Sequence, residues 1–349
     1  MNNISPTMGE YSIDALGSAF EKTKKALIQP FDFWKWIKLG IIIILLGGSG
    51  GGNYSSNSQQ FDGKDFKGET IEAQIEEIFD QIAQFIQQYK TYILIGVAAI
   101  IGISLIFSYI SNVMEFVFVE SLVSNQVKFW AYSGKFLGLG FNLFIIRFIL
   151  GLAAFLLFII AMLPIILPVL QSPETFNAGL LIGGMLWFIA VILMLAVIFG
   201  IIDSFINLSI PLAMYNNTGI IAAVNKVYNN CKAGWEHIIV YWVIRIILRV
   251  VVAIIVGIPI LILFLMIFAI LAGIGGLMYF VLSGIGAGSF VWLVLTPYAL
   301  VVFVLFITFI LLASVPAPVF IKYHMLSFLQ AWYPDAKLPF FDAEESISV

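Results

Sequence analysis

The sequence has very little with which to build a disulfide or a metal centre. It contains one cysteine, Cys231, and two histidines, His237 and His324. A single thiol excludes an intrachain disulfide and any site made of several cysteines. The HExxH motif of zinc hydrolases does not occur either. We therefore expect a protein that is not an enzyme and that has no metal and no cofactor.

Charge is scarce too. Charged residues make up 11% of the 349 residues and the formal net charge is −3, whereas soluble domains carry about 25% charged residues. So small a net charge gives no basis for nucleic acid binding. Apolar residues make up 61%, and several runs reach the roughly 20 residues that cross a bilayer as a helix. The sequence indicates an all-α integral membrane protein whose first partner is the lipid bilayer.

The apolar runs predict six transmembrane helices in a single polytopic domain, 1–349. These spans cover residues 33–48, 91–119, 136–168, 179–214, 238–272 and 290–321. Residues 238–283 are long enough for two spans, but Gly257-Ile258-Pro259 is too short and too apolar to form a loop in water. We therefore expect one kinked helix there, followed by a glycine-rich turn over 273–289.

An amphipathic helix is expected over residues 9–30, before the first span. Its apolar residues lie roughly on one face, opposite its lysines, which is typical of a helix that lies in the membrane interface. The apolar residues are Ile13, Leu16, Phe20, Ala26 and Leu27, and the lysines are Lys22, Lys24 and Lys25.

A second amphipathic helix is expected in the segment between the first two spans, 49–90, after a polar linker. From residue 70 to 89 apolar residues recur at alternating spacings of four and three, which is a heptad seam. They are Ile71, Ile75, Ile78, Ile82, Phe85 and Tyr89. The seam predicts self-association or a protein partner; packing on the protein's own loops or lying on the bilayer is the alternative.

The distribution of charge predicts the orientation. Lysines gather in the segments 9–30, 120–135, 216–237 and 322–349, whereas residues 48–90 carry seven acids against three lysines. Because basic residues favour the cytoplasmic side, we expect these four segments and both termini in the cytoplasm. The heptad helix would then be extracytoplasmic, and the protein would lie in the cell membrane.

Polar and charged residues inside the spans form the candidate site, since a charge at the bilayer centre costs at least roughly 2.5–3.5 kcal/mol. Helical spacing places Asn112 with Glu115 on one face, and likewise Asp203 with Asn207 and Arg245 with Arg249. Asp203 would lie about 18 Å into its span, and Arg245 only about 10 Å, close enough to reach the interface. The candidates are Asn112, Glu115, Arg147, Asp203, Asn207, Arg245 and Arg249.

Two interpretations of these charges differ in function. In one, acids on even-numbered spans pair with arginines on odd-numbered spans around a pathway for an ion or an anionic solute. In the other, they are structural ion pairs that lock together three repeated units, 15–46, 123–152 and 222–251, each an interfacial segment leading into a span. Because the spans have few other polar residues, we favour the second. It predicts a non-enzymatic scaffold or accessory component; the alternative is a small-solute or ion transporter or channel.

The N-terminal part resembles an uncharacterised family of multi-pass membrane proteins, mainly archaeal. The resemblance is carried by Asp14-Ala15-Leu16, Pro30-Phe31-Asp32, Trp34 to Lys38 and the glycine run Gly47 to Asn53. More loosely, the repeated units are similar to the membrane domain attached to some glycerophosphodiester phosphodiesterases. The chain has no phosphodiesterase domain, so the resemblance implies no catalytic residue and no established activity.

Overall fold

The computed structural model describes residues 9–47, 71–171 and 178–342. Within these ranges the chain is almost entirely helical and contains no strand, so the all-α class is confirmed. Most of the glycine run Gly47 to Asn53 and the whole polar linker lie outside the described residues. So do the turn at 172–177 and the acidic end of the tail.

The helices follow one another along the chain with short connections. They are α1 (Glu10–Leu27), α2 (Phe33–Leu46), α3 (Ile71–Val123), α4 (Phe129–Gln171), α5 (Ala178–Tyr215), α6 (Ile220–Ala233), α7 (Trp235–Val252), the π-helical turn η2 (Ala253–Gly257), α8 (Ile258–Gly284), α9 (Phe290–Ala313), α10 (Pro316–Trp332) and the 3-10 turn η3 (Pro334–Ala336).

Five helical stretches are long and apolar enough to cross a membrane. They are Gln84–Val123, Phe129–Pro168, Ile182–Tyr215, Trp235–Gly284 and Phe290–Trp332. The molecule is therefore a multi-pass membrane protein by length and composition of its helices. The first predicted span, 33–48, is not among the five because α2 has 14 residues and extends only about 21 Å.

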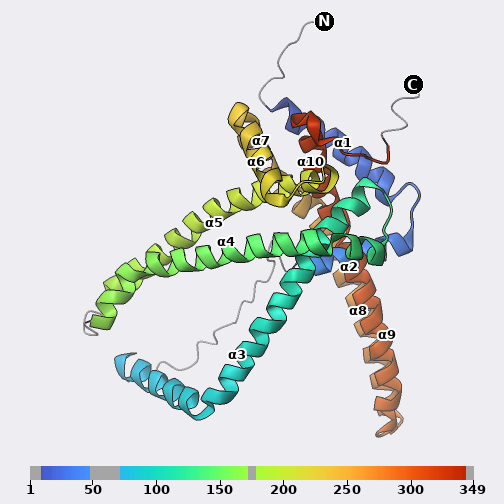
Figure 1. Ribbon diagram of the computed structural model, residues 1–349. Helices are drawn as coiled ribbons and strands as arrows, with labels where there is room; N and C mark the ends of the chain where they lie inside the picture. Colours follow the sequence, from blue (N-terminus) through green and yellow to red (C-terminus); the bar gives the residue numbers. More distant parts are fainter. Residues whose placement is uncertain (1–8, 48–70, 172–177, 343–349) are drawn as a thin grey trace, which may run out of the picture.

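The helices form a central hub from which three arms diverge (Figure 1). We define the hub as α1, α2, α6 and α10 together with the adjoining ends of α3, α5 and α7. Within it α1 packs along α10, α2 lies between α3 and α9, and α6 packs on α5. The arms are α3, the α4–α5 hairpin and the α8–α9 hairpin, and their far ends lie away from α1 and α10 (Figure 1).

The buried core is concentrated in the hub. Residues 113–123 of α3, 204–214 of α5 and 322–329 of α10 are almost all buried. Along the arms, by contrast, most large apolar side chains are exposed, for example Tyr92 at 76% and Phe280 at 75%. Exposed apolar surface all round a helix is what a lipid environment requires, so the arms are the lipid-facing part of the molecule.

Two glycines allow the helices at the hub to come unusually close. A Cβ on Gly140 of α4 would lie 2.5 Å from the Cγ2 of Val113 on α3, and one on Gly40 of α2 would lie 2.4 Å from the carbonyl oxygen of Leu311 on α9. Small residues at contacts of this kind are typical of membrane helices, which have no hydrophobic force to bring them together.

The start of α2 is tied to the hub by polar contacts. Asp32 caps the helix by accepting a hydrogen bond from the Lys35 amide at 3.1 Å. The Lys35 ammonium donates to the carbonyl of Ala26 and to the side chain of Asn125, just after α3. At the other end of α2, Ser111 donates to the Leu46 carbonyl at 3.1 Å. Helix α2 therefore runs antiparallel to the last part of α3.

The first amphipathic helix buries only the C-terminal part of the apolar face that the sequence indicated, which ends at the buried Leu27. α1 buries small residues, among them Ala15 and Ala19, against α10, whereas Ile13 and Phe20 are 60% and 64% exposed. Small side chains are buried there because they let the two helix backbones approach closely.

The last third of the chain also differs from the prediction. The glycine-rich stretch after 272 stays helical to Gly284, and only a short turn precedes α9. The last predicted span, 290–321, is interrupted after Ala313, and Pro316 begins α10, which continues through what the sequence indicated as tail. Proline suits the first turn of a helix because an amide N–H at that position has no acceptor within the helix, so its absence costs no hydrogen bond.

Candidate functional site

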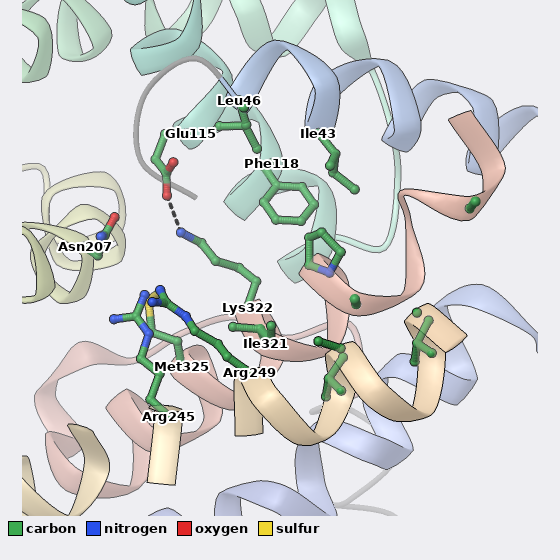
Figure 2. Close-up of a pocket in the computed structure, with 18 of the residues that line it drawn as sticks. Ile43, Leu46, Glu115, Phe118, Asn207, Arg245, Arg249, Ile321, Lys322 and Met325 are labelled. Carbon is green, nitrogen blue, oxygen red and sulfur yellow. Dashed lines mark hydrogen bonds and ion pairs between the residues drawn. The ribbon is translucent and has the colours of Figure 1, made fainter. Parts of the chain in front are cut away.

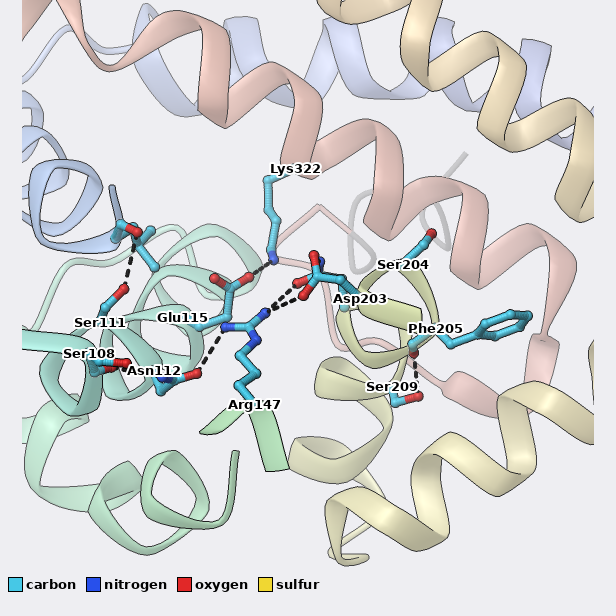
Figure 3. A network of polar contacts seen from close by, with 12 residues as sticks. Ser108, Ser111, Asn112, Glu115, Arg147, Asp203, Ser204, Phe205, Ser209 and Lys322 are labelled. Carbon is cyan, nitrogen blue, oxygen red and sulfur yellow. Dashed lines mark hydrogen bonds and ion pairs between the residues drawn. The ribbon is translucent and has the colours of Figure 1, made fainter. Parts of the chain in front are cut away.

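Arg147 joins three helices at the edge of the hub (Figure 3). From α4 its guanidinium donates to Asn112 of α3 at 2.9 Å, and to Asp203 and Asn207 of α5 at 3.2 and 3.1 Å. Asn207 in turn donates to the second carboxylate oxygen of Asp203 at 2.7 Å. Because Asp203 and Asn207 are four residues apart, both face Arg147. Four of the seven candidate residues therefore meet in one network.

A second ion pair lies beside this network. Glu115 of α3 accepts a hydrogen bond from the ammonium of Lys322 on α10, and both side chains are largely buried, at 15% and 10% exposed. The sequence had indicated an arginine as the partner of Glu115 and had left Lys322 in the tail. A signal was present, since Lys322 stands within the apolar run that begins at Val315.

Arg245 and Arg249 project from α7 toward the same space (Figure 2). Arg245 lies near the hydroxyl of Ser204 at 3.5 Å, and Trp242 donates to that hydroxyl at 2.9 Å. The Nε of Arg245 is buried and makes no hydrogen bond. Ser204, held by Trp242, thus positions Arg245, and sequence reasoning missed both residues because neither is charged.

These groups surround a cavity of about 650 Å³ in the hub. Its polar lining consists of Glu115, Asn207, Arg245, Arg249 and Lys322, and the remaining lining is mostly apolar. Three lining side chains are cationic and one is anionic. Since charges interact strongly where water is scarce, the cavity favours a bound anion over a bound cation.

One wall of the cavity is a turn of π-helix. Ala253, Val256 and Gly257 of η2 line it, and Pro259 follows. The sequence predicted one kinked helix rather than two spans here, and the chain does keep one helical path from Trp235 to Gly284, with the π-turn inserted before Pro259. Proline lacks an amide hydrogen and so disturbs the preceding turn, and π-turns within α-helices are frequent at functional sites.

Glu120 lies apart from the cavity. It pairs with Lys135 at 3.0 Å and accepts a hydrogen bond from the hydroxyl of Tyr215 at 2.8 Å. Because Lys135 is 58% exposed, this pair is at the rim of the hub and serves to fasten α3, α4 and α5 together.

Metal binding finds no support in the described part of the chain. No group of three or more His, Cys, Asp and Glu side chains that could hold a metal ion occurs there. The charged lining of the cavity offers charge recognition by guanidinium and ammonium groups.

The fold and the cavity together define a multi-pass α-helical membrane protein with a cationic cavity between its hub and the start of the α8–α9 arm. The chain belongs to a family of unknown function, DUF7544, whose model matches residues 10–339. No curated protein and no solved structure matches it. The match agrees with the expected membership in an uncharacterised family.

Proposed function

We propose that this protein is a non-enzymatic membrane carrier that binds an anionic solute in the hub cavity. The observation that carries the proposal is the convergence of Arg245, Arg249 and Lys322 on one space whose lining contains a single carboxylate, Glu115 (Figure 2). Like charges gathered in a region of low dielectric repel one another, and an anion among them offsets that repulsion.

The size of the cavity favours an organic anion over a halide. Its volume of about 650 Å³ falls within the roughly 300–1,000 Å³ typical of small-molecule sites, which are mostly apolar with a few polar groups that fix orientation. The neutral Arg147 network supports the same function by holding Asn207 at the cavity wall.

A binding measurement tests this proposal. The purified full chain in phosphatidylcholine nanodiscs is titrated calorimetrically with inorganic phosphate, succinate and octyl phosphate. We expect at least one of these anions to bind, and Arg245→Gln to weaken its binding at least tenfold. Lys24→Gln, which removes an equal charge from the exposed face of α1, is the control. Absence of binding by all three anions, or equal binding by Arg245→Gln, would contradict the proposal.

A flux measurement tests the carrier step. Proteoliposomes are loaded with the anion that binds, and its radiolabelled form is added outside. We expect exchange that Arg249→Gln slows at least tenfold and Lys24→Gln does not. Binding without exchange would reject the carrier and leave a binding protein.

The same proposal includes the topology. α1 and α10 lie together in the hub, whereas α3 begins at the far end of its arm (Figure 1). Helix α2 begins beside Asn125 and ends beside Ser111, so it runs in the direction of the α3 arm. This supports six crossings, with α2 as part of the first, and places α1 and α10 on one side of the membrane. The lysines of the predicted interfacial segments support the cytoplasm as that side.

A scaffold is the second candidate, and one observation favours it. Phe85 and Tyr89, at the end of the predicted heptad seam, are 58% and 40% exposed; the side chains of residues 71–83 lie outside the described part. A scaffold acting through this seam would self-associate. Light scattering of the detergent-solubilised protein would then give a dimer or larger species that Phe85→Ser returns to a monomer.

A further inference from the structure

The cavity is amphiphilic. Its charged groups, on α3, α7 and α10, lie together at one side, whereas Ile43 and Phe118 lie away from the two arginines (Figure 2). Apolar lining continues along the α7–η2–α8 path through Val252, Val256 and Ile260. A water-soluble anion would use only the charged side, while an amphiphile would fill both.

The cavity is also open along a lipid-facing helix. Arg249, Ala253 and Gly257 line it and yet are exposed. On the same helical path Ile255 is 66% exposed, and Ile258, directly after the π-turn, is 51% exposed. The opening therefore faces the region that hydrocarbon covers in a bilayer. A ligand with acyl chains reaches it from the membrane without crossing water.

The depth of Arg249 points to a phosphate. Arg249 is the fifteenth residue of α7, about 21 Å along the helix from its start at Trp235. It therefore stands well within the apolar part of the helix. Arginine binds phosphate through two parallel charge-assisted hydrogen bonds, and basic pockets between membrane helices hold anionic lipid headgroups. Arg245, one turn away, presents a second fork to the same space.

We infer that the ligand is an anionic phospholipid, whose phosphate lies between Arg245, Arg249 and Lys322 and whose acyl chains pass Val256 and Ile260 to leave beside α8. This inference rests on the proposed anion-binding function and names its ligand class. Glu115 keeps the Lys322 ammonium at the phosphate position by pairing with it from α3. The π-turn contributes Gly257, whose lack of a side chain leaves open space at the exit.

Lipid retention tests the inference. The full chain is purified from nanodiscs containing equal amounts of phosphatidylglycerol and phosphatidylcholine, and bound lipid is counted by native mass spectrometry. We expect at least a tenfold preference for phosphatidylglycerol, lost in Arg249→Gln and partly kept in Arg249→Lys. The control is Lys24→Gln, which should retain the preference.

Soluble probes separate the two possible sources of phosphate. Titration into phosphatidylcholine nanodiscs should give octyl phosphate at least tenfold tighter binding than inorganic phosphate. Equal retention of both lipids, with inorganic phosphate or succinate binding in an Arg245-dependent way, overturns the lipid inference and leaves the proposed function standing. No binding of any anion, lipid or soluble, overturns both.

Discussion

At the scale of single residues, the hub stabilises each buried charge in a different way. Arg147 has three acceptors on two neighbouring helices, whereas Lys322 has the carboxylate of Glu115. Breaking a buried pair by removing one partner costs about 3–5 kcal/mol, because the other charge is left in a medium of low dielectric. Removing both partners of a pair should therefore destabilise the protein less than removing one of them.

The Glu115–Lys322 pair gives a prediction on these grounds. Glu115→Gln should lower the free energy of unfolding by about 3 kcal/mol, measured by denaturant titration in detergent. Combining it with Lys322→Met should recover at least half of that loss, because no buried charge then remains without its partner. Equal losses for the single and the double variant would contradict this account of the pair.

The single thiol gives a prediction of pH dependence. Burial raises the pKa of the Cys231 thiol above its usual range, so the thiolate, which is the reactive form, is scarcer at neutral pH than in a free cysteine. The iodoacetamide labelling rate should therefore keep rising about tenfold per pH unit beyond pH 8.5, where a free cysteine begins to level off.

The control for this measurement is the same chain unfolded in dodecyl sulfate. Its labelling rate should level off at a lower pH than that of the folded protein, because the thiol is no longer buried. If the labelling rates of the folded and unfolded forms level off at the same pH, the fold does not raise the pKa of the thiol.

At the scale of elements, the site depends on how closely α3 and α4 approach. Val113, which Gly140 touches, is the neighbour of Asn112, and Arg147 stands two turns beyond Gly140 on α4. The glycine contact therefore sets the distance over which the guanidinium reaches Asn112. The helix crossing and the polar network are one structural unit.

Gly140→Ala should consequently destabilise the protein by about 1–3 kcal/mol, since the new methyl group overpacks a contact with the Cα and the side chain of Val113. Gly138→Ala, on the same helix with nothing within 4 Å, should be neutral or stabilising by up to about 1 kcal/mol. Thermal unfolding of both variants in one detergent compares them directly. Similar behaviour of the two variants would refute the close contact.

At the scale of the whole molecule, the hub has a packed core like that of a soluble domain, while the arms expose apolar surface along most of their length. The two terminal helices, α1 and α10, pack on each other within the hub, and the far ends of the arms lie away from them (Figure 1). This division predicts that the hub and the arm tips lie on opposite sides of the membrane.

Cysteine accessibility checks the orientation. A membrane-impermeant maleimide should leave Cys231 of α6 unlabelled on intact cells and label it in inverted vesicles. In a Cys231→Ser background, Ser289→Cys, placed in the exposed turn between α8 and α9, should show the reverse pattern. Labelling of Cys231 on intact cells would place the hub outside and overturn the charge argument.

Much of the architecture followed from local features of the sequence. The length of the apolar runs determined the membrane class and the helical state. In lipid, the backbone N–H and C=O groups can form hydrogen bonds only with one another, and a helix provides these bonds. The gaps between the predicted spans, at 169–178 and 273–289, predicted both hairpins, although Gly273 to Gly284 stayed helical. Helical spacing placed Asp203 with Asn207, and Arg245 with Arg249, on common faces, as the contacts of these residues reflect.

Tertiary structure alone decided which groups meet. Glu115 pairs with Lys322, 207 residues away in sequence, and the cavity draws its lining from five separate parts of the chain. Likewise, α1 buries its alanines and leaves Phe20 exposed because α10 packs against the side of α1 that carries the alanines. Periodicity reports which face of a helix is apolar or charged; the helix that covers this face is set by long-range packing, which no local pattern records.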